Sequence, residues 1–150
     1  MEVQTFETTG FLSSMEHIKG LENILQFGAI FAAGGDGTIN ECINGMLMRE
    51  DRAVVPIGLV PLGSGNDFCR GFELFKPEDA VDAYAAGDLL EIDAVKILLD
   101  HESVEAVKFA CEGDLAKEVS HFRYMLLNSG LALVANINAN VSRKMLNTLG

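Results

Sequence analysis

The spacing of apolar residues along the first third of the chain predicts two helices. The first covers Ser14–Gln26, where Ser13 and Glu16 have the S-x-x-E spacing of a capping box and one face is apolar, made of Met15, Ile18, Leu21 and Leu25. The second is predicted over Thr38–Met48, on a stripe that consists of Ile39, Cys42, Ile43, Met46 and Leu47.

A third helix is predicted further along, with two irregular segments before it. Proline at a first helical position, followed by two acidic residues, predicts a helix over Pro77–Ala86, and Gly87 ends it. The polar stretch Arg49–Arg52 is predicted as a loop. Phe68–Lys76 is predicted to be irregular.

Short apolar runs between these segments predict strands. Val3–Glu7 alternates loosely and is a weak strand pattern, whereas Ala29–Ala33 is wholly apolar, as in strands buried on both faces of a parallel sheet. Val54–Val60 is the next strand, in which Pro56 is tolerable only near the start. Ile92–Leu99 is a further candidate.

Alternation of strands and helices stops after this point. Val104–Cys111 and Phe122–Asn128 both have strand patterns with an acidic segment between them, which predicts a hairpin, and Leu133–Leu149 is weakly helical. We therefore expect residues 1–91 to form an α/β lobe and residues 92–150 to begin a β-rich second lobe.

Composition restricts the classes of partner. The chain has 150 residues, of which 49% are hydrophobic, so it can bury a core. Its 11 basic and 22 acidic residues give a net charge of −11. Nonspecific nucleic-acid binding requires a basic footprint, and so does electrostatic anchoring on anionic membranes. We therefore expect no nucleic-acid partner, and a phosphate site has to rely on backbone dipoles.

Cysteine usage and the N-terminus favour a cytoplasmic protein. Three cysteines without CxxC spacing support neither a disulfide framework nor a zinc site, so no metal ligands are assigned. Cys42 lies on a helical apolar stripe, where a free thiol acts as a small hydrophobe. No signal peptide is recognisable, and no segment approaches the ~18 apolar residues of a membrane span.

Two glycine-rich segments provide the candidate chemistry. GGDGT, residues 34–38, follows the apolar run Ala29–Ala33, and PLGSGND, residues 61–67, follows the run 57–60. A strand, a glycine turn and a helix together expose backbone N–H groups to a phosphate. Two such turns predict two strand ends that open into one crevice holding a polyphosphate.

The two segments also carry a resemblance to a known family. GGDGTINECING, residues 34–45, and GLVPLGSGNDFCR, residues 58–70, resemble the catalytic domain of the diacylglycerol kinase family, which includes sphingosine, ceramide and bacterial lipid kinases. The resemblance is weak along most of the chain and specific in these two segments. It implies a doubly wound parallel-sheet nucleotide lobe like those of phosphofructokinase and NAD kinase, followed by an antiparallel second lobe.

The resemblance also implies an activity and its participants. Such an enzyme transfers the γ-phosphate of ATP, with Mg²⁺, to a hydroxyl of diacylglycerol or a sphingoid-type lipid, and it contacts membranes peripherally. The nucleotide-binding residues that it implies are Thr8, Gly34, Gly35, Asp36, Gly37, Thr38, Ile39, Asn40, Gly63, Ser64, Gly65 and Asn66. Ser64 stands where the family usually has threonine, and the hydroxyl is retained. Thr9 is an alternative to Thr8.

Acidic residues in the glycine segments are the catalytic candidates. A carboxylate in an anion-binding turn needs a cation, a proton or local hydrogen bonds. The resemblance implies that Asp36 is either the general base or a residue that positions nucleotide and metal, and the alternative is a stabiliser of an Asx-type turn. Asp67 is either an N-cap or a carboxylate near the acceptor. Glu41 can complement a helix N-terminus, and Arg70 can reach a phosphate, although a solvated side chain is the simpler interpretation. The three histidines show no metal spacing and are interpreted as surface residues.

Three hypotheses about the function remain open. A lipid kinase is favoured. NAD kinases share the GGDG turn but lack PLGSGND. A non-catalytic nucleotide-binding or interaction module is the alternative from another class. Since the family normally begins with an upstream Asn-Pro-x-Ser-Gly strand and continues into a longer second lobe, we expect this chain to be a fragment of a lipid kinase.

Overall fold

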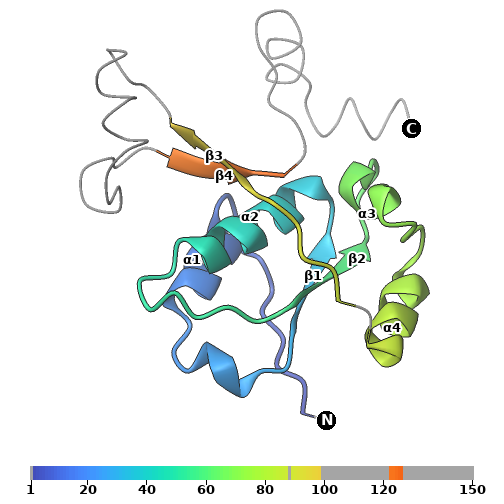
Figure 1. Ribbon diagram of the computed structural model, residues 1–150, viewed down its shortest axis with the longest axis horizontal. Coiled ribbons are helices and arrows are strands. Elements are labelled where there is room, and N and C mark those ends of the chain that lie inside the picture. The colour runs from blue at the N-terminus through green and yellow to red at the C-terminus, as the bar shows by residue number, and fades with distance from the viewer. Residues whose placement is uncertain (1, 88, 99–121, 127–150) are drawn as a thin grey trace, which may run out of the picture.

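The computed structural model describes residues 2–87, 89–98 and 122–126 (Figure 1). In chain order its elements are α1 (Ser13–Gly20), the 3₁₀ turn η1 (Ile24–Gln26), β1 (Ile30–Gly34), α2 (Asp36–Leu47), β2 (Ile57–Pro61), α3 (Asp67–Gly71), α4 (Pro77–Ala86), β3 (Val95–Leu98) and β4 (Phe122–Met125). The fold is mixed α/β.

Strands β1 and β2 pair in parallel, with Ile30 opposite Ile57 and Gly34 opposite Pro61. The carboxyl ends of the two strands therefore lie side by side, and each leads directly into a glycine turn. Helix α2 connects the strands, as a parallel pair requires a crossover. The predicted parallel sheet is confirmed, with two strands among the described residues.

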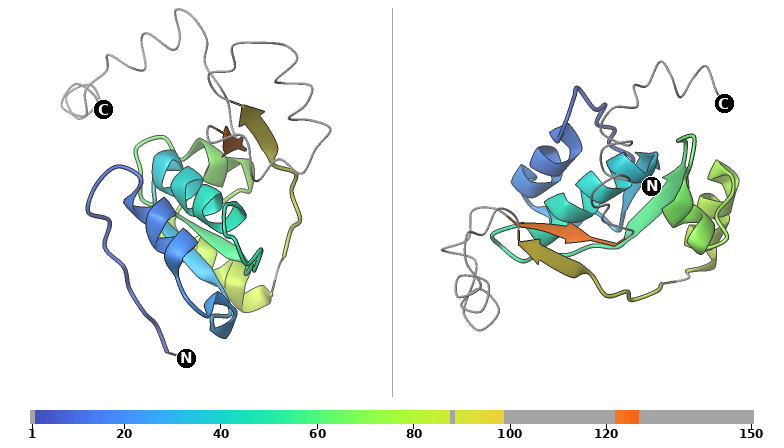
Figure 2. Two further views of the ribbon diagram at one scale, coloured as in Figure 1. Left: turned by 90° about the vertical axis from the view of Figure 1, so that its left-hand side faces the viewer. Right: turned by 90° about the horizontal axis from the view of Figure 1, so that it is seen from above.

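Helices lie on both sides of this strand pair (Figure 2). On the side of α1 and α2, Ala32 is buried in the core. On the side of α4, the ring of Phe31 meets the ring of Tyr84 edge to face, with centroids 5.2 Å apart. Phe31 is nevertheless 41% exposed, so the expectation that this strand is buried on both faces is only partly met.

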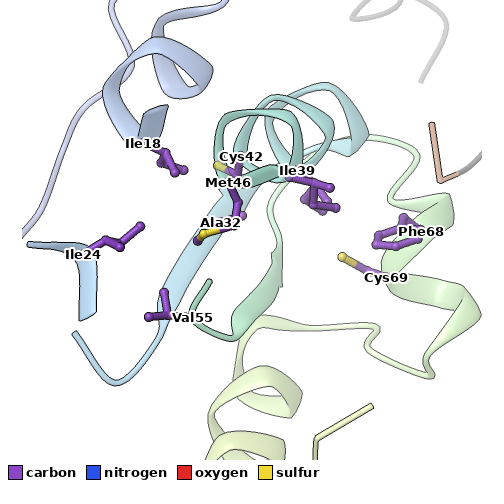
Figure 3. Packing of buried hydrophobic residues seen from close by; sticks show 10 residues of the cluster. Ile18, Ile24, Ala32, Ile39, Cys42, Met46, Val55, Phe68 and Cys69 are labelled. Atoms are coloured by element: carbon purple, nitrogen blue, oxygen red, sulfur yellow. The ribbon is translucent and has the colours of Figure 1, made fainter. Parts of the chain in front are cut away.

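The core lies between α2, the strands and α3 (Figure 3). Ile39, Cys42 and Met46 project from one stripe of α2, and this confirms the predicted helical face. Leu47, predicted on the same stripe, is exposed. Ile43 of the same helix also belongs to the cluster, and its remaining buried members come from other parts of the chain and are Ile18, Ile24, Ala32, Val55, Phe68 and Cys69.

Helix α1 is shorter than predicted. It ends at Gly20, Leu21 is extended, and Asn23 is left-handed with φ 53°, so Ile24–Gln26 form a separate 3₁₀ turn. The predicted capping box is also wrong. The Ser13 hydroxyl accepts hydrogen bonds from the N–H groups of Thr9 and Gly10 instead.

Residues of α2 and the loop after it hold both ends of α1. The Glu41 carboxylate accepts hydrogen bonds from Leu12 N at 3.0 Å and Ser14 N at 3.3 Å, so it caps α1 rather than its own helix. Arg49 donates to Ile18 O at 2.6 Å at the other end. Between them, Gly45 lets the two helices touch, because a Cβ at this position would lie 2.6 Å from Met15 O.

Other predicted boundaries shift. Val3–Glu7 forms no strand: these residues are exposed and have no neighbouring strand to pair with among those described. The strand predicted over Val54–Val60 begins only at Ile57, immediately after Pro56, which cannot donate to the ladder. Phe68–Lys76 is not wholly irregular, because α3 extends to Gly71.

The third predicted helix is confirmed at both ends. Helix α4 covers Pro77–Ala86, and the Asp79 carboxylate accepts a hydrogen bond from Lys76 N at 3.0 Å at its start. Gly87, with φ 76°, ends the helix in the left-handed conformation that glycine adopts without strain.

After α4 the strand pairing becomes antiparallel. Val95 lies opposite Met125 and Leu98 opposite Phe122, so the strand predicted over Ile92–Leu99 pairs with the one predicted over Phe122–Asn128. The strand predicted over Val104–Cys111 and the helix predicted over Leu133–Leu149 lie outside the described residues. No helix in the described part of the chain is long and apolar enough to cross a bilayer.

Candidate functional site

The two glycine turns touch each other at the carboxyl end of the parallel strands. Leu62 N donates to Gly34 O at 3.0 Å, which extends the sheet pairing by one residue. A Cβ on Gly35 would lie 3.2 Å from Gly63 Cα, and a Cβ on Gly63 would collide with Gly35 Cα. Both positions therefore need glycine because two backbones meet. The two glycine turns therefore converge in the structure, as predicted.

The second turn is held in shape by Asn66. This residue is left-handed, with φ 56°, a conformation that asparagine tolerates better than most residues. Its side chain accepts from Gly63 N at 2.8 Å and donates to Gly63 O at 2.7 Å. Ser64 and Gly65, between these two residues, are exposed at the tip of the turn.

Asp36 links the first glycine turn to α3, the helix that follows the second glycine turn. Its Oδ1 accepts from Phe68 N at 2.9 Å, and its Oδ2 accepts from Asp67 N at 3.1 Å. These are first-turn N–H groups of α3, which have no partner within their own helix. Asp36 is thus the N-terminal cap of α3, contributed from a distant part of the chain, rather than a local turn stabiliser.

The N-terminus of α2 points into the same region. Its N-cap, Gly35, provides no side chain to cap the helix, and Gly35 O accepts from Ile39 N at 3.1 Å. Gly37 is exposed, and a Cβ there would meet nothing within 4 Å. Such a helix start binds anions through its N–H groups and its dipole.

A cleft of about 330 Å³ lies beside this helix start, between α2, α3 and the β3–β4 pair. Asp36, Gly37 and Asn40 contribute polar atoms to one wall, and Arg123 is the only cation that lines the cleft among the described residues. Its remaining walls are mostly apolar and consist of Ile39, Ile43, Phe68, Ile97, Tyr124, Met125 and Leu126. A cavity with apolar walls and a few converging polar groups is typical of a ligand site.

Some of the predicted site residues lie at the glycine turns or at the start of α3, and others lie elsewhere. Thr38 packs against the first turn: a Cβ on Gly34 would lie 2.6 Å from its hydroxyl oxygen. Asp67 is exposed at the start of α3. Thr8 and Thr9 are exposed before α1, and no hydrogen bond within the described ranges joins either residue to a glycine turn. Arg70 is exposed.

Arg123, Phe68 and Asn44 were not among the residues to which the sequence pointed. Arg123 lies in a short strand without a motif, and no local signal shows that this strand returns to α2. His17 is exposed, as predicted, and stacks on Phe6 with ring centroids 3.8 Å apart. His101 and His121 lie outside the described residues.

The donor set fits the ATP and Mg²⁺ that the resemblance implies. Mg²⁺ in such sites is held by one or two carboxylates together with substrate phosphates. Asp36 and Asp67 are adjacent and can play this part, since each oxygen of Asp36 keeps a lone pair beyond its N–H partner. No cluster of three or more His, Cys, Asp or Glu residues occurs in the described part of the chain.

The two described cysteines are core residues. Burial, with a smaller contribution from Glu41, raises the pKa of the Cys42 thiol to about 11. Burial and then the nearby Asp36 carboxylate raise the pKa of Cys69. Because the thiolate is the reactive form, neither is suited to nucleophilic chemistry. This agrees with the interpretation of Cys42 as a small hydrophobe.

Comparison with known proteins gives a family. Residues 1–97 match the diacylglycerol kinase catalytic domain. A diacylglycerol kinase of Staphylococcus saprophyticus is 33% identical over 106 residues, which are 65% of this chain and 33% of that protein. For a diacylglycerol kinase of Bacillus subtilis the identity is 33% over 93 residues, 53% of this chain and 30% of that protein. A Salmonella arizonae protein named "Probable lipid kinase YegS" is 38% identical over 69 residues, 45% of this chain and 23% of that protein.

The chain thus spans about a third or less of the length of these relatives. No solved structure matches it significantly. Since the family match covers well over half of the sequence, the chain belongs to the diacylglycerol kinase catalytic domain family.

Proposed function

We propose that the chain is the nucleotide-binding part of an ATP-dependent lipid kinase, which transfers the γ-phosphate to a hydroxyl of diacylglycerol or a sphingoid-type lipid. The observation that carries this proposal is the contact of the two glycine turns, of which the first lines the cleft through Asp36 and Gly37. Leu62 N donates to Gly34 O, and the Gly35 and Gly63 backbones meet without side chains between them. Backbone N–H groups at such a place hold phosphates with little help from net charge.

The cleft suits the rest of the reaction. Phosphoryl transfer depends on positioning the phosphates and neutralising their charge. The start of α2 lies on one side of the cleft and Arg123 on another, and both favour an anion between them. The apolar walls suit the part of a lipid next to its hydroxyl.

We assign Asp36 to positioning rather than to the role of base. Both of its oxygens already accept backbone N–H groups of α3, so the carboxylate is held in one orientation. A carboxylate held in this way can direct its remaining lone pairs at Mg²⁺ or at a phosphate-bound water. Asp67 is exposed beside it and is the second candidate.

We further propose that residues 1–91 form the nucleotide lobe, of the phosphofructokinase and NAD-kinase kind, and that residues 92–150 begin the second lobe. The change from parallel to antiparallel pairing after α4 supports this division. The use of ATP together with a lipid acceptor supports a cytoplasmic location with peripheral contact to membranes.

The test has two parts. Calorimetric titration with ATP or ADP plus Mg²⁺ compares the wild type with Gly37→Ala and Ser64→Ala, two exposed positions where an added or lost atom disturbs no packing. We expect weaker binding by both variants. Equal affinity in all three proteins would remove the glycine turns from the site. Transfer is measured separately, with radiolabelled ATP and mixed micelles that contain diacylglycerol or sphingosine.

A non-catalytic nucleotide-binding module is the second candidate. It is favoured by the engagement of both Asp36 oxygens with N–H groups of α3, because the residue predicted as a possible general base then serves as a helix cap. ATP binding without phosphorylation of either lipid would support this candidate over the kinase. Transfer to one of the two lipids would exclude it and identify the acceptor class.

A further inference from the structure

Asn44 is a buried amide that joins the nucleotide helix to a distant strand. It lies in the last turn of α2 and is 1% exposed. Its Oδ1 accepts from Tyr124 N at 2.8 Å, and its Nδ2 donates to Tyr124 O at 2.9 Å. Nδ2 also donates to Asn40 O at 2.9 Å, one turn earlier in the helix. Nδ2 further approaches Asn40 Oδ1 at 3.2 Å, so both of its hydrogens have acceptors, and the two bonds to Tyr124 cross 80 residues of sequence.

The pairing with Tyr124 has the pattern of a sheet. In an antiparallel strand the N–H and C=O of one residue point to the same side. The Asn44 side chain forms hydrogen bonds with both the backbone N–H and the backbone C=O of Tyr124. At this residue the edge of β4 therefore faces α2. One side chain thus replaces one residue of a neighbouring strand, and it satisfies two backbone groups that would otherwise be unpaired.

This pairing fixes two walls of the cleft relative to each other. Asp36 and Gly37 line the cleft at the start of α2, and Arg123 and Met125, the neighbours of Tyr124, line it from β4. The described hydrogen bonds between α2 and β4 all come from Asn44. This amide is therefore the described polar link between the helix that follows the first glycine turn and the strand that carries Arg123.

We propose that Asn44 is a positioning residue, which couples the helix that carries the first glycine turn to β4 and so sets the width of the cleft. The use of the cleft for ATP rests on the proposed function, but the coupling itself does not. A side chain needed only for the stability of α2 would require the bond to Asn40 O and not the two-way pairing with Tyr124.

The pairing can be observed directly in the wild-type protein. Nuclear magnetic resonance measures scalar coupling across a hydrogen bond, here between the Tyr124 amide nitrogen and the side-chain carbonyl carbon of Asn44. We expect a measurable coupling and slow hydrogen exchange at Tyr124 N–H. No coupling, together with exchange as fast as in an exposed strand, would overturn the proposal without any variant.

Variants then separate positioning from stability. Asn44→Ala removes the pairing, and Met46→Ala is the matched control, because Met46 is buried on the same helix and belongs to the core cluster. Relative to β1 amides in the same sample, Tyr124 N–H should exchange about tenfold faster or more in Asn44→Ala, as expected for the loss of two hydrogen bonds. It should not do so in Met46→Ala. The same relative rate in both variants would show a purely structural role.

The link to the nucleotide is read in the same samples. On titration with ATP and Mg²⁺, the amide signals of both Gly37 and Arg123 should shift in the wild type. In Asn44→Ala the shift at Gly37 should remain, and the shift at Arg123 should fall by at least half. Shifts at both sites in Asn44→Ala would contradict the coupling. No shift in the wild type would contradict the proposed function instead, and the exchange result would still decide the role of Asn44.

Discussion

Oδ1 of Asp36 accepts a hydrogen bond from the backbone N–H of Phe68 at 2.9 Å, across 32 residues of sequence. The residue in the middle of the first glycine turn is therefore the cap of the helix that follows the second turn. The aspartate keeps the two turns together as well as facing the cleft. Asp36 therefore has two roles, as the cap of α3 and as a residue that lines the cleft.

Asp36→Asn should lower the free energy of unfolding by about 1 kcal/mol, within the range for loss of a helix cap. Asparagine keeps one acceptor oxygen, but its NH₂ group faces the N–H of Asp67 or Phe68. Urea unfolding followed by circular dichroism measures the change. An unchanged midpoint would mean that the capping bonds contribute nothing.

The same variant tests the proposed role in phosphoryl transfer. If the carboxylate positions Mg²⁺ or the nucleotide, its replacement should lower the rate of transfer on the order of a hundredfold, more than the stability change explains. Assays are run at a temperature where both proteins are fully folded. Near-normal turnover with lowered stability would leave Asp36 as a cap alone.

Gly63→Ala should destabilise the protein by about 2 kcal/mol or more, because the new Cβ would collide with Gly35 Cα and lie 2.8 Å from Asn66 Oδ1. Gly37→Ala is the control. Its Cβ meets nothing within 4 Å, and alanine favours a helix over glycine by up to about 1 kcal/mol. Thermal unfolding of the two variants should shift in opposite directions. Equal shifts would show that the two turns are not in contact.

Gly45→Ala should cost about 1–3 kcal/mol, since its Cβ would lie 2.6 Å from Met15 O and push α1 away from α2. Gly20→Ala, at the end of α1, has open space around the added atom and should be neutral or stabilising. Urea midpoints compare the two. A neutral Gly45→Ala would mean that the helices are not closely packed.

The ion pair of Arg49 and Asp51 should make the free energy of unfolding depend on pH in the acidic range. Hydrogen bonds from the Arg49 side chain and then from Ala53 N lower the pKa of Asp51 from its ordinary value of 3.8. A lowered folded-state pKa adds stability above the unfolded-state pKa, and this stability is lost as the pH falls through the folded-state value. The wild type should therefore be more stable than Asp51→Asn by a constant amount from pH 7 to about pH 5.

Below about pH 4 this difference should shrink, because Asp51 is protonated first in the unfolded state. Below the folded-state pKa it is protonated in both states. Urea unfolding at a series of pH values measures the difference. A difference that stays constant down to pH 2.5 would show that the charge of Asp51 does not contribute to stability. Arg49→Lys provides a check, because lysine cannot make the paired contact of Nε and Nη2 with the two Asp51 oxygens.

Features that depend on neighbours along the chain could be predicted from the sequence alone. The stripe on Ile39, Cys42 and Met46 predicted α2, because a helical period is local. Pro77 and Gly87 marked the two ends of α4 for the same reason. Two apolar runs, each followed by a glycine turn, were enough to predict that the turns meet, since parallel strands bring their carboxyl ends to one edge.

The hydrogen-bond partners of the polar side chains depend instead on the folded arrangement of the elements. Asp36, Glu41 and Asn44 each have a clear hydrogen-bonding capacity in the sequence, but their partners lie on α3, α1 and β4. The loose pattern of Val3–Glu7 likewise forms no strand, because a strand exists only where another strand pairs with it. Local spacing predicts a helix or a turn, whereas a long-range hydrogen bond depends on how the packed core brings two elements together.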